Sequence, residues 1–168
     1  MKFELCPWEI GRTYRVPHFI LVRTPYGDVL LYPSYHHDAD SVAPNLAESD
    51  ESEVYKWVIP AAHDFLFEHR IFADCTPCDQ DTADRVYRWL CKHSNNWWRR
   101  QVTGLRYRFL RWFGGVVWDA RDKLGEPIPI KYEAYYGANP AARRLRSMLP
   151  VVVVHPRTKR LTVHAPGT

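Results

Sequence analysis

Apolar and polar residues near the start of the chain follow the pattern of short β-strands. Four runs are rich in β-branched and aromatic residues: 3–5, 14–16, 19–23 and 28–32. Prolines separate these runs, and proline is tolerated at strand ends and edges. The sequence Pro25-Tyr26-Gly27-Asp28 is a turn signal, which predicts a hairpin formed by the last two runs.

From about residue 48 the apolar spacing becomes that of helices. A first helix is predicted over 54–69, where Pro60 indicates a kink or a late start. A second helix is predicted to be capped by Asp79 or Asp81 and to end near His93. Its apolar residues recur at helical intervals, at positions 83, 86, 87 and 90.

A third helix is predicted from about Asn95 to Trp118. Four of its apolar residues share one stripe: Leu105, Phe109, Trp112 and Phe113. Most of its arginines lie off that stripe. This favours an amphipathic helix whose arginine stems cover apolar surface.

The remaining segment mixes a proline-rich loop with regular structure. A short basic helix is predicted over 141–149, and Val151–His155 with Leu161–His164 predicts a terminal hairpin. Together the elements predict an α+β fold, with an N-terminal antiparallel β-meander packed on a bundle of about three helices. The expected boundaries are a compact domain over 1–120 and a C-terminal extension over 121–168, which ends in the hairpin.

Composition is that of a globular protein. The 168 residues are 46% hydrophobic and 25% charged, which suits one domain. The apolar runs fall far short of the ~20 residues of a membrane span, and the first residues lack the apolar stretch of a signal peptide. We therefore expect an intracellular protein without membrane insertion. The net charge is +4, with acid gathered in 38–84 and base in 92–160, so a local basic face is expected.

The first group of chemically capable residues follows the β-rich part of the chain. His36, His37, Asp38, Asp40 and Ser41 lie close together in sequence. Imidazole and carboxylate are suitable ligands for zinc, manganese or iron. The competing interpretation is a polar loop, in which the Asp and Ser side chains bond to nearby backbone.

A second group lies on the predicted helices. His63 and Asp64 form an adjacent pair within an apolar stretch, where a buried histidine needs a polar partner. His63 is either a core histidine bonded to a carboxylate or carbonyl, or a ligand or general base. Asp84 begins the next helix, where it can cap the helix, pair with a nearby arginine, or meet His63 across the helix pair.

Cys75 and Cys78 have the C-x-x-C spacing of a zinc site or a redox dithiol. A structural zinc would need two further ligands, and Cys91, His69 and His93 are near in sequence. A redox role would need a strand before the motif and a helix that opens with it. Inert thiols are the third interpretation.

Several residues are of the types that protein interfaces favour. The predicted helix from about Asn95 to Trp118 interleaves aromatic and basic residues, a combination that can also bind nucleic acid. Nucleic-acid binding is the weaker expectation, because arginine stems that cover apolar surface explain the spacing of these residues. The extension adds tyrosines and arginines that suit contact with neighbouring subunits. The candidate interface residues are Trp97, Trp98, Arg106, Tyr132, Tyr135, Tyr136, Arg143 and Arg144.

Taken in order, four motifs resemble the phage and prophage family known as domain of unknown function thirteen fifty-three. They are Tyr35–Pro44, His63–Phe67, Ala83–Tyr87 and Phe113–Trp118, all within residues 3–118. The chain departs from that pattern where Ser34 replaces a glycine, Asp40 replaces a small residue and Pro44 lies one place late. The resemblance implies a phage origin and a compact α+β domain. It also implies that five candidate catalytic residues converge: Asp38, Ser41, His63, Asp64 and Asp84.

These observations lead to three expectations about function. The first is a virion structural or assembly component that contacts other phage proteins or copies of itself, with 121–168 as an interaction arm. The second is a hydrolase of amide or peptidoglycan-type bonds, in which Asp38, His63 and Asp84, with His36, hold one zinc or manganese ion. The third is a host-directed phage accessory protein. The expected location is the virion or the cytoplasm of the infected host.

Overall fold

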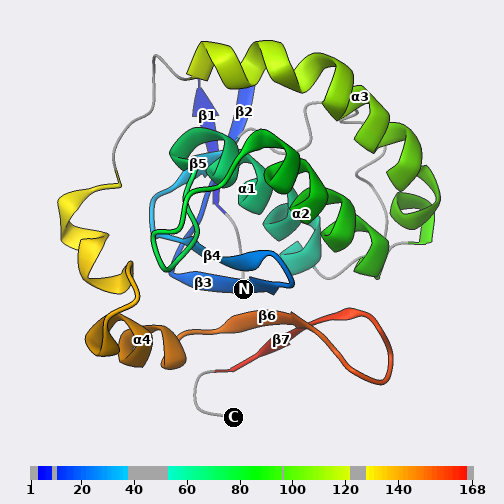
Figure 1. Cartoon of the computed structure of the whole chain (residues 1–168). Coiled ribbons are helices and arrows are strands. Elements are labelled where there is room, and N and C mark those ends of the chain that lie inside the picture. The colour runs from blue at the N-terminus through cyan, green and yellow to red at the C-terminus, as the bar shows by residue number, and fades with distance from the viewer. Residues whose placement is uncertain (1–3, 9–10, 38–52, 96, 122–127, 166–168) are drawn as a thin grey trace.

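The computed structural model describes residues 4–8, 11–37, 53–95, 97–121 and 128–165. Within these ranges the chain is a mixed α+β fold with two sheets and a group of packed helices (Figure 1). This confirms the fold class expected from the sequence. The candidates Asp38, Asp40 and Ser41 lie outside the described residues.

The N-terminal strands divide between two sheets and do not form one continuous meander. Strands β1 (Glu4–Trp8), β2 (Gly11–Arg15) and β5 (His36–His37) form one antiparallel sheet in that order. Strands β3 (Ile20–Thr24) and β4 (Gly27–Leu31) form the predicted hairpin in the other sheet. Pro17 and Pro33 lie at the two crossings between the sheets, where their lack of an N–H prevents a continuous ladder.

Three helices follow the strands. They are α1 (Glu53–His69), α2 (Gln80–His93) and α3 (Trp97–Arg121). Pro60 lies inside α1, so the helix does not start late. Asp79 caps α2 as predicted, with its side chain accepting a hydrogen bond from the Thr82 amide at 2.7 Å.

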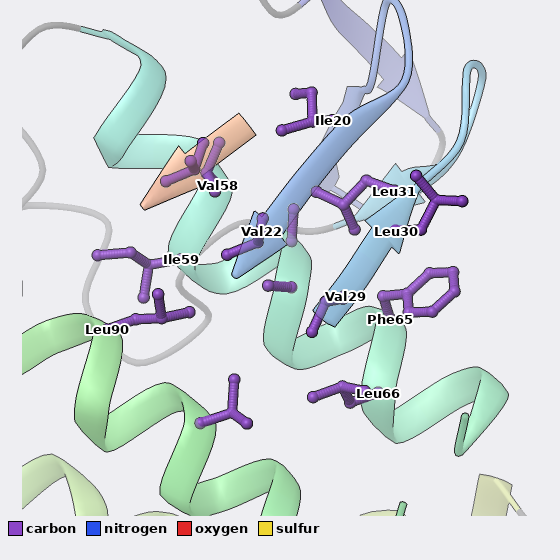
Figure 2. Packing of buried hydrophobic residues seen from close by; sticks show 14 of the residues in the cluster. Ile20, Val22, Val29, Leu30, Leu31, Val58, Ile59, Phe65, Leu66 and Leu90 are labelled. Atoms are coloured by element: carbon purple, nitrogen blue, oxygen red, sulfur yellow. The ribbon is translucent and has the colours of Figure 1, made fainter. Parts of the chain in front are cut away.

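The core lies between the β3–β4 hairpin and the helices α1 and α2 (Figure 2). Strand β4 buries Val29, Leu30 and Leu31 in succession, because the hairpin is covered on both faces. The helices contribute side chains such as Ile59, Phe65, Leu66 and Leu90, all fully buried. This continuous apolar core fixes the angle at which α1 meets α2.

The C-terminal segment packs onto the same core. The 3₁₀-helix η2 (Ile130–Tyr135) and helix α4 (Pro140–Ser147) lead to strands β6 (Val151–Val154) and β7 (Leu161–His164). Strand β6 pairs with β3 in parallel and with β7 in antiparallel orientation, which extends the hairpin sheet to the order β4-β3-β6-β7. The described part of 121–168 therefore does not project as an arm, because its strands complete the main sheet (Figure 1).

Candidate functional site

The centre of the candidate site is a contact between α1 and α2. The Nε2 atom of His63 lies 3.2 Å from Oδ1 of Asp84. The His63 residue is 7% exposed and Asp84 is fully buried. The structure thus brings together two of the residues predicted from the sequence. A contact with His63 across the helix pair is one of the three roles expected for Asp84.

Asp64 supplies a second carboxylate. Its Oδ1 atom lies 3.8 Å from Nδ1 of His63, so the imidazole has a carboxylate near each ring nitrogen. Burial acts to lower the pKa of His63, but the hydrogen bonds and negative charges of Asp64 and Asp84 outweigh it and raise the pKa above its usual 6.5. The arrangement therefore favours imidazolium held between two carboxylates.

The second oxygen of Asp84 faces α3. Oδ2 accepts no hydrogen bond from the described residues and lies 3.6 Å from the Arg111 guanidinium. Arg111 also lies 3.4 Å from Asp81, which pairs with Arg85 at 2.6 Å. A line of alternating charges thus runs from the buried histidine to the surface between α2 and α3.

Aromatic rings enclose the imidazole. The rings of Phe67 and Tyr87 lie 4.3 and 5.0 Å from the ring of His63. Trp118 of α3 packs edge-on against Phe67 at 4.9 Å. Because the histidine is covered and paired, this geometry is that of a buried polar network that orients three helices.

The residues expected to hold a metal ion are distributed over three parts of the chain. His63 and Asp84 lie in contact, whereas Asp38, like the catalytic candidate Ser41, lies outside the described residues. His36 is exposed on β5, where its backbone pairs with Arg15. Across the described ranges, no group of three or more His, Cys, Asp or Glu side chains is placed to hold a metal ion.

The cysteine pair lies in a tight loop between α1 and α2. An isolated bridge joins Ile71 to Pro77, and the Cys78 amide donates to the Arg70 carbonyl at 2.7 Å. Cys75 is exposed and Cys78 is buried, and both thiols are free. Burial, aided by nearby Asp79 and Asp84, raises the pKa of Cys78 to about 12. A protonated, buried thiol suits the inert interpretation.

The tyrosines expected at an interface hold the C-terminal segment to the protein itself. The rings of Tyr132 and Tyr135 lie 5.4 and 4.1 Å from the ring of Phe19. Tyr136 is buried and donates its hydroxyl hydrogen bond to the Leu30 carbonyl. All three side chains make contacts within the protein, but only Tyr136 is buried, so the assignment of Tyr136 to an external interface is corrected.

The arginines and tryptophans of the interface set differ from the tyrosines. Arg143 and Arg144 are exposed on α4, and Trp97 is 61% exposed at the start of α3. Trp98 and Arg106 lie on α3, but their side chains are outside the described set.

The apolar stripe of α3 lies on the outer face of the helix. Leu105, Phe109 and Trp112 are 58, 41 and 72% exposed, so these three residues of the predicted stripe face outward. The inner face carries buried Thr103 and Gly114 instead. A Cβ atom at Gly114 would lie 3.0 Å from Nε2 of the Gln80 side chain of α2 and 3.6 Å from the ring of Phe67. The sequence offers no spacing signal for this face, because Gly104 and Gly115 share the eleven-residue interval of Thr103 and Gly114 and are not buried.

Comparisons with protein-family profiles, with curated proteins and with solved structures found no match for this chain. None of the helices in the described ranges combines the length and apolar character needed to cross a membrane.

Proposed function

We propose that this protein is a structural or assembly component of a phage virion that acts through protein–protein contacts. The observation that carries the contact role is the outer face of α3. Val116 is 75% exposed there and continues the stripe of Leu105, Phe109 and Trp112. Figure 1 shows α3 along the outside of α2, and the exposed fractions of its apolar side chains place the stripe on the side away from the fold. Apolar residues gathered on an exposed face are typical of interaction sites.

The spacing of the stripe suggests a second copy of the chain as its first partner. The intervals between the four residues are four, three and four, so the stripe reads the same in both directions. In an antiparallel pair of α3 helices, Leu105 of one copy would face Val116 of the other, and Phe109 would face Trp112. Such a two-fold contact is closed and self-complementary. The large rings then meet at its centre, where interface energy concentrates.

The test measures the molar mass of the purified protein in solution. We expect light scattering coupled to size-exclusion chromatography to show dimers that dissociate on dilution over about a hundredfold range of concentration. The double variant Phe109→Ser with Trp112→Ser should be monomeric. A matched control replaces Ile130 and Met148, which are 84 and 61% exposed outside α3, by serine. A parent monomer at all concentrations, or dissociation by the control variant alone, would contradict the self-contact.

The virion assignment is supported by the ordered motifs that resemble the phage family. It predicts that peptides of this chain are found in purified, nuclease-treated phage particles at a fixed ratio to a major structural protein. A protein present in infected cells but lost from purified particles would instead support the host-directed accessory role.

The metal-dependent hydrolase is the second candidate function. The contact between His63 and Asp84 favours it, because both side chains belong to the expected ligand set. If this role holds, protein purified without chelator carries about one equivalent of zinc or manganese, and His63→Ala removes it. A folded parent that takes up neither ion excludes this mechanism.

A further inference from the structure

A charged pocket lies on the side of the molecule where the C-terminal segment meets the β3–β4 hairpin. Its volume is about 390 Å³. The hairpin, the loop after α1 and helix α4 each supply part of the wall. The lining residues are Leu21, Arg23, Asp28, Ala73, Asp74, Arg143, Arg146 and Ser147. None of the residues of the His63 network lies among them.

Arg146 is the fixed element of this pocket. The residue is only 8% exposed, and its Nη1 atom donates to the carbonyls of Ala73, Tyr135 and Gly137 at 3.1, 2.7 and 2.9 Å. Its Nε and Nη2 atoms donate to none of the described residues, and no carboxylate among them lies within ion-pair distance. A buried guanidinium usually has a paired anion. Asp28 and Asp74, which also line the pocket, interact with Arg146 through their charge but form no direct ion pair with it, so its remaining donors are available to an anion.

Arg143 places a second guanidinium beside the first. It lies one turn before Arg146 on α4, and both line the pocket. Arg143 is exposed, and its side chain makes no ion pair or hydrogen bond with the described residues. Two guanidiniums with unused donors on one wall match the geometry by which arginine binds carboxylate or phosphate oxygens.

The other charged residues make one side of the pocket acidic and the other side basic. Arg23 approaches Asp28 at 3.8 Å, which is a long ion pair between partly exposed groups. Burial, with Asp74 nearby, raises the pKa of Asp28 against the opposing effect of Arg23 and Arg146. Asp74 uses Oδ1 to accept from the Thr76 amide and hydroxyl at 3.0 and 2.6 Å. The hairpin and loop walls thus offer carboxylate acceptors, whereas α4 offers donors.

We propose that this pocket binds a small molecule through a compact anionic oxyacid group, a phosphate or a carboxylate, held by Arg143 and Arg146. Hydroxyl or amino groups on the same molecule donate to Asp28. The volume is near the lower end of the range for small-molecule sites, roughly 300–1,000 Å³. This binding is separate from the contact role of α3, since the two sites lie on different elements.

The first test is a titration followed by the backbone amide signals of Ala73, Asp74 and Ser147 in nuclear magnetic resonance spectra. Inorganic phosphate and acetate are added separately at constant ionic strength. We expect saturable shifts confined to the pocket, and the anion that saturates at lower concentration identifies the oxyacid class. Absence of saturation with both anions in well-folded parent protein would overturn the proposal.

Two neighbouring residues of α4 provide a matched pair of variants. Arg143→Gln should weaken anion binding about tenfold or more, because it removes a charge-assisted hydrogen bond. Arg144→Gln should leave it nearly unchanged, since Arg144 is exposed on the same helix but does not line the pocket. Both replacements are at exposed positions, so the fold is retained. Equal weakening in the two variants would show diffuse surface charge only and would overturn the site.

Glycerol phosphate tests the acidic wall. We expect it to bind more tightly than inorganic phosphate, because its hydroxyl groups can donate to Asp28. The variant Asp28→Asn should reduce this preference while inorganic phosphate still binds. Equal affinity of the parent for the two phosphates would contradict the role given to Asp28.

Discussion

The imidazole of His63 and the carboxylate of Asp84 form a contact of 3.2 Å between two helices, and almost none of either residue is exposed. Arg111 approaches the same carboxylate from α3 at 3.6 Å. One buried carboxylate thus connects α1, α2 and α3.

The first prediction concerns the loss of the histidine. His63→Ala should lower the free energy of unfolding by about 3–5 kcal/mol, because it leaves the buried Asp84 carboxylate without its closest partner. Urea denaturation followed by circular dichroism measures the change. The double variant His63→Leu with Asp84→Leu should be less destabilised, since it removes both charges and keeps apolar volume. A double variant as unstable as His63→Ala or worse would show that packing, not the unpaired charge, dominates.

The second prediction concerns pH. The folded-state pKa of His63 is raised above 6.5, so the protonated ring contributes stability that is fully present below the unfolded-state pKa. That contribution is lost as pH rises through the folded-state pKa. The groups facing the ring are Asp64 and Asp84, with Arg111 behind Asp84.

Urea unfolding from pH 6 to 9 measures this dependence. The parent should lose stability as pH rises, and His63→Gln, which keeps a hydrogen-bond donor without the titration, should be flatter over the same range. Greater parent stability at the alkaline end would mean that the ring is neutral in the folded protein at pH 6.

The sequence indicated the contact between His63 and Asp84 as one of three roles for Asp84. His63 sits in an apolar helical stretch and Asp84 beside the apolar stripe of the next helix, so one packing of two helices brings them together. The same reasoning predicted the hairpin and the cap at Asp79. These features depend on local spacing and on a single helix-to-helix contact, which periodicity reports well.

The orientation of α3 could not be obtained in that way. Its apolar residues lie on more than one face, and periodicity alone does not say which face turns inward. In the structure Gly114 lies on the face toward α2, beside the Gln80 side chain, whereas the larger Phe109 and Trp112 face outward. The pocket was equally hidden, because Asp28 and Arg146 are far apart in the sequence. Long-range contacts bring them to one pocket, namely the pairing of β3 with β6 and the hydrogen bonds of both residues to the Ala73 backbone.

The third prediction tests the close approach of α3 to α2. Gly114→Leu should destabilise the protein by about 1–3 kcal/mol, because its side chain would meet Gln80 and the ring of Phe67. Gly115→Leu is the matched control, since a Cβ atom there meets nothing within 4 Å and leucine is a better helix former. It should be neutral or stabilising by up to about 1 kcal/mol. Thermal unfolding distinguishes the two. Equal loss in both variants would place Gly115, too, against the body of the protein.

The fourth prediction concerns the cysteine pair. The pKa of Cys78 is about 12 and its side chain is buried, so almost none of it is thiolate at pH 8. Cys75 is exposed and should react much faster with iodoacetamide in the native protein. Peptide mapping by mass spectrometry gives the alkylation rate at each site, and urea should make the two rates similar. Equal rates in the native protein, or a Cys75–Cys78 disulfide formed readily in a glutathione buffer, would restore the redox interpretation of this motif.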